Sequence, residues 1–204
     1  MKLNDEIDAL DATGVDVQVL SATPQTYLYN QEPALGAVLS AIQNDQMAKH
    51  IAAHPSRFLG IATLPMQDPK RAADELKRAV SKLGLQGTMF ASNIMGKNLD
   101  DPSFEPVWAT AQELGAFVFI HPVEGGGRAE LRDYYMWNVI GNPMETTIAA
   151  GHLILSGVME AFPRLKILLA HGGGALPYVH GRLDRGFKQR PEINKVISKP
   201  PTEY

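Results

Sequence analysis

The sequence predicts an α/β protein built on parallel strands, and two observations carry this prediction. Short apolar runs alternate with longer helical patterns along the 204 residues, and such alternation is typical of right-handed βαβ units. The nearly all-apolar run at 116–120 is typical of a strand that is covered on both faces of its sheet. Five units of this kind fit either an open, doubly wound sheet or part of a closed barrel, and their spacing alone does not choose between the two.

The first unit consists of a strand at 15–20, which Thr23-Pro24 closes, and a helix that is expected to end before Pro55. The residue that precedes a proline avoids the helical region, which is why the helix ends there. Residues 58–64 predict the second strand. The helix between them carries apolar residues at the i, i+3, i+4, i+7 spacing of one helical face: Leu35, Val38, Leu39 and Ile42.

The next two helices have clear start and stop signals. Asp68-Pro69 and Asp101-Pro102 each combine an N-cap residue with a proline at the first helical position. Gly84 and Gly115 end the same two helices, because glycine is common just past a helix. A strand at 85–91 lies between them. The buried stripes consist of Leu76, Ala79, Val80 and Leu83 in the first helix, and Val107, Trp108, Ala111 and Leu114 in the second.

The last third of the chain repeats the pattern with a longer connection. After the strand at 116–120 come a glycine run at 125–127 and an aromatic group of Tyr134, Tyr135 and Trp137. A well buried helix is expected at about 145–161, since it is apolar most of the way round. Residues 167–170 predict the fifth strand, and a glycine run at 172–174 leads into a final helical stretch through Arg182.

Composition excludes several classes of function. The net charge is −3, with 45% hydrophobic residues and no cysteine, so neither nucleic acid nor an anionic membrane is an expected partner. The absence of cysteine excludes disulfides and thiolate metal sites and fits a cytoplasmic setting best. The N-terminus is too polar for a secretory signal. The longest uncharged stretch of the second half, 146–159, is shorter than the ~20 apolar residues that span a bilayer.

Two of the six histidines follow predicted strands directly. His121 comes after the strand at 116–120, and His171 comes after the strand at 167–170. The carboxyl edge of parallel strands is the functional edge in barrels and open sheets alike. Neighbouring strands lie ~4.8 Å apart, so both imidazoles could reach one small ligand, as metal ligands or proton carriers. The alternative is that each is a hydrogen-bonded structural residue.

The other histidines are interpreted as structural. His50 and His54 have the spacing of a helical metal pair, but no glutamate accompanies them, and a cationic side chain is favoured at a helix C-terminus. His152 lies in the predicted buried helix and is expected to be a core residue with one satisfied hydrogen bond, while His180 is ambiguous. No phosphate loop, dinucleotide fingerprint or nucleophile elbow occurs in the sequence.

Three motifs resemble the amidohydrolase-related (amidohydrolase 2) family, and within it proteins similar to aminocarboxymuconate-semialdehyde decarboxylase. They are Phe119-Ile120-His121-Pro122, Asn142-Pro143-Met144-Glu145-Thr146-Thr147 and Ala170-His171-Gly172-Gly173-Gly174. The match extends in order over essentially the whole chain. The resemblance implies a (β/α)8 barrel with one divalent metal, most often zinc.

The resemblance also implies roles for three residues. His121 corresponds to a metal ligand, and His171 to the acid–base group that activates water and moves protons. Arg182 corresponds to an arginine that binds the carboxylate of the substrate and comes from a neighbouring subunit, which implies a homodimer for the full-length protein. A planar, bidentate guanidinium suits a carboxylate. The alternative for Arg182 is a surface ion pair with Asp184 or Glu192.

The sequence departs from the family pattern in its metal site. It contains no His-x-His motif and no aspartate-bearing last strand. We therefore expect residues 1–204 to form one incomplete barrel domain with strands two to six, whose remaining metal ligands lie outside this chain. The strand at 85–91 contains no lysine, so one metal is favoured over two. The aromatic segment 135–138 also differs from the family pattern, which leaves the substrate open.

We expect the full-length protein to be a metal-dependent decarboxylase (a carboxy-lyase) that acts on an unsaturated or aromatic carboxylic acid. Zinc is the expected metal. A hydrolase or hydratase of the same superfamily remains an alternative, because it would use the same metal-bound water. The alternative of another class is an inactive fragment or a non-catalytic interaction protein. Catalytic zinc has three protein ligands as a rule, so the isolated 204-residue chain is expected to bind zinc poorly and to be inactive.

Overall fold

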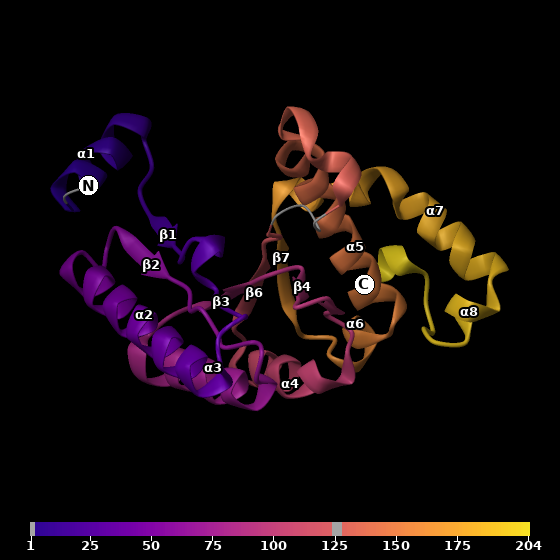
Figure 1. The fold of residues 1–204 in the computed structure, drawn as a ribbon, viewed down its shortest axis with the longest axis horizontal. Coiled ribbons are helices and arrows are strands. Elements are labelled where there is room, and N and C mark those ends of the chain that lie inside the picture. The colour runs from indigo at the N-terminus through magenta and orange to yellow at the C-terminus, as the bar shows by residue number, and fades with distance from the viewer. Residues whose placement is uncertain (1–2, 124–127) are drawn as a thin grey trace.

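A computed structural model describes residues 3–123 and 128–204 of the chain. The strands β1 and β2 pair in parallel, as do β3, β6 and β7. A parallel bridge between Ala62 and Thr88 joins the two groups, so the five strands lie side by side in the order of the sequence (Figure 1). All five predicted strands are confirmed, with these bounds: β1 Gln18–Leu20, β2 Phe58–Gly60, β3 Gly87–Phe90, β6 Phe117–Ile120 and β7 Lys166–Leu169.

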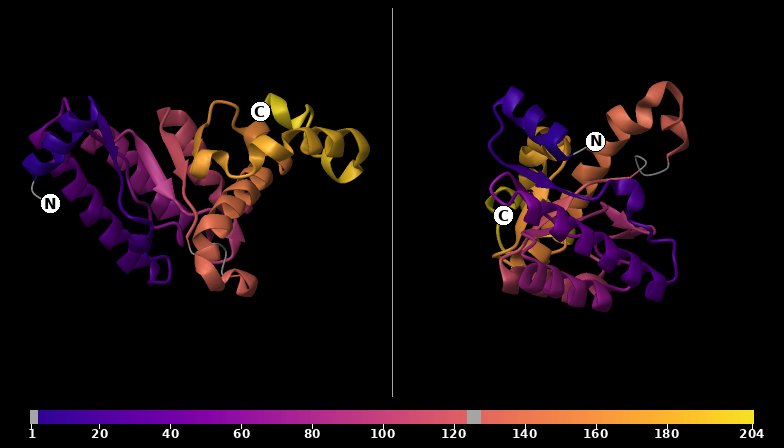
Figure 2. Two further views of the ribbon diagram at one scale, coloured as in Figure 1. Left: turned by 90° about the horizontal axis from the view of Figure 1, so that it is seen from above. Right: turned by 90° about the vertical axis from the view of Figure 1, so that its left-hand side faces the viewer.

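The helices connect successive strands, and α2, α3 and α4 lie along one side of them (Figure 1). Figure 2 shows α1 and α2 at one end of the molecule and α7 and α8 at the other. Among the described residues no helix is long and apolar enough to cross a membrane. The helices are α1 Leu3–Thr13, α2 Pro33–Ala53, α3 Pro69–Leu83, α4 Glu105–Leu114, α5 Asn142–Leu155, α6 Val158–Ala161, α7 Leu176–Gln189 and α8 Pro191–Asn194.

The predicted start of α3 and the predicted stops of α3 and α4 are confirmed, whereas Asp101 caps a 3₁₀ turn and α4 itself begins at Glu105. The Asp68 carboxylate accepts a hydrogen bond from the Arg71 backbone N–H at 3.2 Å, which satisfies one of the free donors at the start of α3. Gly84 and Gly115 have φ angles of +73° and +62°, the left-handed conformation that glycine adopts without strain. A 3₁₀ turn at Pro102–Phe104 precedes α4.

The hydrophobic core lies between the strands and the helices α3 and α4. Its largest fully buried side chains include Trp108, Phe90 and Phe104. The Phe90 and Trp108 rings contact each other at a centroid distance of 5.6 Å, and the Trp108 indole N–H donates to the Leu99 carbonyl at 3.2 Å. The opposite side of the outer strands is more open, because Val19, Leu59 and Leu168 are 47%, 37% and 51% exposed.

The helix α2 buries an unexpected face. The apolar residues that indicated the helix lie mostly on its exposed side, where Leu35, Val38 and Ile42 are 47%, 56% and 53% exposed. Its buried residues are instead small or polar: Gly36, Ser40 and Asn44. A Cβ on Gly36 would lie 2.1 Å from the Gln67 side chain, so close packing against the neighbouring segment requires this polar, small-residue stripe.

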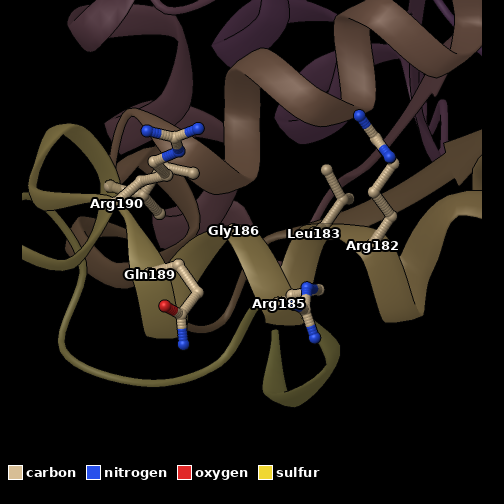
Figure 3. Close-up of a pocket in the computed structure, with 7 residues that line it drawn as sticks. Arg182, Leu183, Arg185, Gly186, Gln189 and Arg190 are labelled. Carbon is tan, nitrogen blue, oxygen red and sulfur yellow. The ribbon is translucent and has the colours of Figure 1, made fainter.

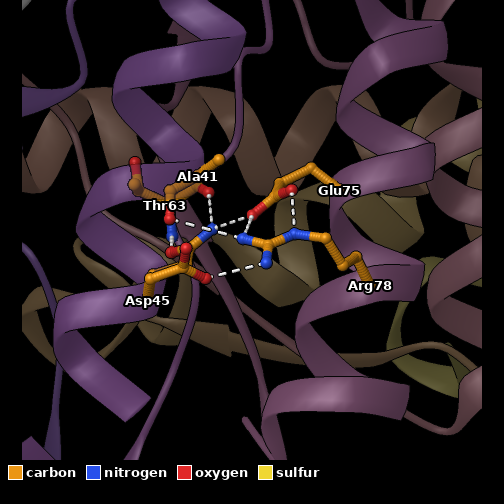
Figure 4. A network of polar contacts seen from close by, with 6 residues as sticks. Ala41, Asp45, Thr63, Glu75 and Arg78 are labelled. Atoms are coloured by element: carbon orange, nitrogen blue, oxygen red, sulfur yellow. Dashed lines mark hydrogen bonds and ion pairs between the residues drawn. The ribbon is translucent and has the colours of Figure 1, made fainter. Parts of the chain in front are cut away.

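A buried polar network joins α2 to α3 (Figure 4). The Asn44 amide donates to the Thr63 carbonyl at 2.9 Å and to the Glu75 carboxylate at 2.6 Å. The Thr63 backbone N–H donates in turn to the Asn44 side-chain oxygen at 2.9 Å. Arg78 donates to Glu75 at 2.8 Å and to Asp45 at 2.7 Å. Asn44 is only 1% exposed, so water cannot satisfy its amide, and these hydrogen bonds to protein groups do so instead.

Three local features differ from the sequence prediction or lie outside it. The segment at 93–98 forms a small antiparallel hairpin, β4 Asn93–Ile94 and β5 Lys97–Asn98, whose turn residues Met95 and Gly96 both have positive φ. The helix expected at 145–161 is interrupted at Gly157, which has a φ of +88° and separates α5 from α6. The glycine run at 125–127 lies outside the described residues.

Candidate active site

The two strand-end histidines lie side by side. The His121 backbone N–H donates to the Phe90 carbonyl of β3 at 3.0 Å, and the Ala170 N–H donates to the Ile120 carbonyl at 3.1 Å. These bonds extend the ladder past the strand ends and place both histidines at one edge of the sheet. The imidazole centroids are 5.0 Å apart with an interplanar angle of 58°. The prediction that both rings can reach one small ligand agrees with this geometry.

The orientation of the His121 ring follows from its hydrogen bond. Its Nδ1 lies 2.8 Å from the Pro122 carbonyl oxygen. A carbonyl only accepts, so Nδ1 must carry the proton and donate it. The neutral ring then has its lone pair on Nε2, as a metal-ligating histidine requires. Phe119 contacts the ring edge-on at a centroid distance of 6.1 Å.

His171 has a more constrained setting. It is a non-glycine residue with a φ of +55°, an uncommon conformation that often occurs at functional sites. Its Nδ1 lies 3.1 Å from the hydroxyl of Thr146 in α5. Burial, and then the proximity of His121, lower the pKa of His171, because both disfavour the charged imidazolium. The ring is therefore held in its neutral form over a wider pH range than a free histidine.

The glycine run after His171 allows the turn to lie directly against α5. A Cβ on Gly174 would lie 2.0 Å from the Pro143 carbonyl oxygen, and the φ of Gly174 is +63°. No side chain fits there, so glycine is required at this position. Glycine at this position therefore lets the turn after β7 pack against the first turn of α5.

Arg182 lies apart from the histidines. It is exposed on α7 and lines an open hollow of about 660 Å³ that includes neither His121 nor His171. Figure 3 shows its guanidinium group and that of Arg190 at opposite ends of this hollow. Among the described residues Arg182 forms no ion pair, and Asp184 instead accepts hydrogen bonds from Thr202 at 2.7 and 3.1 Å. The alternative of an Arg182–Asp184 pair is therefore wrong.

Three of the other four histidines have structural partners. His50 Nε2 lies 3.2 Å from the Glu6 carboxylate, and His180 Nδ1 lies 2.6 Å from the Pro177 carbonyl. His152 Nδ1 lies 3.0 Å from the Asp100 carboxylate. The predicted hydrogen bond of His152 is confirmed, but its position in the core is wrong, because its side chain is 36% exposed.

The donor set fits part of a divalent metal site. Two imidazoles at neighbouring strand ends, one with Nε2 free, are donors that zinc and similar ions accept. Within 3–123 and 128–204 no group of three or more histidine, cysteine or carboxylate side chains could hold an ion. A complete site would thus need ligands from outside the described residues.

Sequence reasoning missed Thr146 as a site residue. It is fully buried, and among the described residues its hydroxyl is the one hydrogen-bond partner of the His171 ring, at 3.1 Å. The signal was present, since Thr146 belongs to the segment 142–147 that carries the family resemblance. Its role depends on how α5 packs against the turn after β7, and sequence spacing does not report that packing.

Comparison with known proteins identifies the family. Residues 2–197 match the amidohydrolase family, and the chain belongs to it. The 2-amino-3-carboxymuconate-6-semialdehyde decarboxylase of Dictyostelium discoideum is 40% identical over 97% of this chain and 55% of its own length. The gamma-resorcylate decarboxylase of Rhizobium radiobacter is 31% identical over 86% of this chain and 57% of its own. The chain thus spans a little over half the length of these relatives.

Solved structures agree with this assignment. The 5-carboxyvanillate decarboxylase of Sphingomonas paucimobilis is 35% identical and matches with a TM-score of 0.90 over 98% of this chain and 61% of its own. A dihydroxybenzoic acid decarboxylase from Polaromonas sp. JS666, with bound manganese and the inhibitor 2-nitroresorcinol, is 27% identical with a TM-score of 0.89 over 100% of this chain and 65% of its own. The predicted family is confirmed.

Proposed function

We propose that this chain is part of a metal-dependent decarboxylase that acts on an unsaturated or aromatic carboxylic acid. The observation that carries the proposal is the pair His121 and His171, 5.0 Å apart at the carboxyl ends of neighbouring parallel strands. Two relatives that align with most of this chain are named decarboxylases. A cytoplasmic, small-molecule enzyme is consistent with the absence of cysteine.

We further propose that residues 1–204 form one domain, which supplies strands two to six of a (β/α)8 barrel. Three features favour a barrel over a doubly wound sheet. The five strands follow the order of the sequence without the reversal that a doubly wound sheet has. The helices α2 to α4 share one side. On the other side Val19, Leu59 and Leu168 are exposed, as the interior residues of an unclosed barrel would be.

The proposed roles follow the chemistry of each residue. His121 would ligate the metal through Nε2, since Nδ1 is bound to the Pro122 carbonyl. Decarboxylation breaks the bond between the carboxylate carbon and the rest of the substrate. Carbon dioxide leaves, and the electron pair of the broken bond stays on the substrate carbon. Nε2 of His171 would first take up a proton from water and then deliver it to that carbon, as an acid–base group near neutrality can. The metal, when bound, supplies a Lewis acid that polarises the substrate.

Substrate binding involves Arg182 in this proposal. Its guanidinium would bind the carboxylate of a substrate held by a neighbouring subunit, so the full-length protein would be a homodimer. The exposed position of Arg182, outside any ion pair within the described residues, leaves it available for a second chain. Replacement by lysine keeps the charge but loses the bidentate geometry, so Arg182→Lys should raise KM for the acid more than it lowers kcat.

The identity of the metal is a separate part of the proposal. Zinc is favoured by the sequence resemblance, whereas the Polaromonas structure holds manganese. Imidazole ligands suit zinc, whereas manganese favours carboxylate, carbonyl and water oxygens. Metal analysis of the purified full-length protein, followed by chelation and reconstitution with each ion, distinguishes zinc from manganese. The native ion should restore full turnover at one equivalent.

The test of the function is carbon dioxide release from candidate aromatic acids, with His171→Ala as the matched variant. Loss of His171 should abolish release while metal content stays near that of the wild type. A hydrolase or hydratase using the same site would convert substrates without producing carbon dioxide. The non-catalytic alternative is favoured by one observation, the lack of a three-donor cluster among the described residues, and inactivity of the full-length protein with metal would establish it.

A further inference from the structure

We propose that Thr146 is a positioning residue that fixes the tautomer of His171, with the proton on Nδ1 and the lone pair on Nε2. The Thr146 hydroxyl makes two contacts, one to His171 Nδ1 at 3.1 Å and one to the Asn142 carbonyl at 3.1 Å. The assignment of the tautomer comes from these contacts alone. Its consequence for proton transfer rests on the proposed function.

The direction of each hydrogen bond follows from the number of protons available. A threonine hydroxyl has one proton to donate, and a carbonyl oxygen can only accept. Both contacts of Thr146 can be hydrogen bonds at once only when its hydroxyl proton goes to the Asn142 carbonyl, four residues earlier in α5. The contact with His171 must then run the other way, with the Nδ1–H donating to the hydroxyl oxygen. Thr146 is 0% exposed, so water does not readily replace either contact.

The neighbouring threonine supports this assignment independently. Thr147 donates its hydroxyl proton to the Pro143 carbonyl at 2.9 Å and accepts from the Ala175 backbone N–H at 2.7 Å. The direction of the second bond is unambiguous, because a backbone N–H only donates. Both hydroxyls thus donate back into α5 and accept from the turn after β7. Together they hold that turn at two points, His171 and Ala175.

The result is a pair of rings with the same exposed nitrogen. His121 donates from Nδ1 to the Pro122 carbonyl, and His171 donates from Nδ1 to Thr146. In both neutral rings the lone pair is then on Nε2, the nitrogen that a metal or a transferred proton can use. Partners that fix a histidine in this way commonly alter activity or affinity by roughly 10–100-fold when they are removed.

The tautomer can be measured without any activity. Imidazole ¹⁵N NMR of the full chain, labelled in histidine and recorded without added metal, distinguishes a protonated ring nitrogen from a bare one. His171→Gln assigns the signals by their loss. We expect protonated Nδ1 and bare Nε2 for His171 in the wild type and in Thr146→Ser, which keeps the hydroxyl. Thr146→Val keeps the shape of the side chain and loses the hydroxyl. In this variant the His171 signals should move towards those of the other tautomer, with bare Nδ1 and protonated Nε2.

The matched control is Thr147→Val, which removes a hydroxyl from the same helical turn but none that contacts His171. Its His171 signals should stay those of the wild type. A wild-type His171 with the proton on Nε2, or a Thr146→Val spectrum identical to that of the wild type, overturns the proposal.

Kinetics provides the second readout. Thr146→Val should lower kcat roughly 10–100-fold with KM nearly unchanged, and Thr146→Ser should restore most of it. An equal loss in both variants would contradict the positioning role. If the full-length protein releases no carbon dioxide from the aromatic acids tested, the proposed function fails, whereas the NMR result still decides the role of Thr146.

Discussion

The network around Asn44 gives the sharpest prediction about stability. In Asn44→Leu the side chain keeps a similar size but loses every hydrogen bond. Two buried groups are left without a partner, the Thr63 carbonyl and the Thr63 N–H, whereas the Glu75 carboxylate keeps its bonds from Arg78. A buried polar group left unsatisfied costs about 1–3 kcal/mol, and more when it is charged. We therefore expect a loss of at least about 2 kcal/mol, a large fraction of the roughly 5–15 kcal/mol of a typical domain.

Urea denaturation of the full chain, followed by the fluorescence of the buried Trp108, measures this loss. Gln46→Leu is the matched control, because Gln46 lies on the exposed side of the same helix and should change the free energy of unfolding by less than about 0.5 kcal/mol. The reasoning is refuted if Asn44→Leu unfolds at the same urea concentration as Gln46→Leu with an unchanged m value.

Three further predictions concern the site and the C-terminal segment. Gly174→Ala should lower the melting temperature more than Gly172→Ala, because only at Gly174 would the new Cβ clash, 2.0 Å from the Pro143 oxygen; equal shifts would contradict this. His121→Ala should lower metal occupancy in elemental analysis, and full retention would exclude ligation. Hydrogen bonds from Tyr204 and Ser198 lower the pKa of Glu160 from 4.5 to about 2, so their stabilising effect is complete above about pH 4.5 and is lost as the pH falls towards 2. Hydrogen exchange of residues 198–204 should show this loss in the wild type and not in Glu160→Gln.

Local signals determined much of the fold in advance. Each predicted strand appears, and the caps at Asp68, Gly84 and Gly115 have the expected geometry, because such features depend on a few neighbouring residues. The buried face of α2 was not predictable in the same way. Its apolar residues indicated a helix correctly, but the packing of Gly36 against Gln67 and the bonds of Asn44 decide which side is buried.

The same division applies to the candidate site. His121 and His171 could be located from sequence, since a histidine directly after a parallel strand falls on a known edge of the sheet. The hydroxyl partner of His171 lies on α5, 25 positions away in the sequence. The hairpin at 93–98 was missed because its turn, Met95-Gly96, lacks the Asn-Gly or Asp-Gly signature of such turns.

The sequential strand order affects how the chain can fold. Each strand pairs with the strand formed just before it, apart from the small hairpin, so each βα unit can dock on a neighbour that has already been synthesised. Domains fold largely as they emerge during synthesis, and pairing between units adjacent in sequence keeps the entropy of loop closure low. We therefore expect folding to proceed from β1 towards β7, with His121 and His171 brought together only when the last of these strands has joined the sheet.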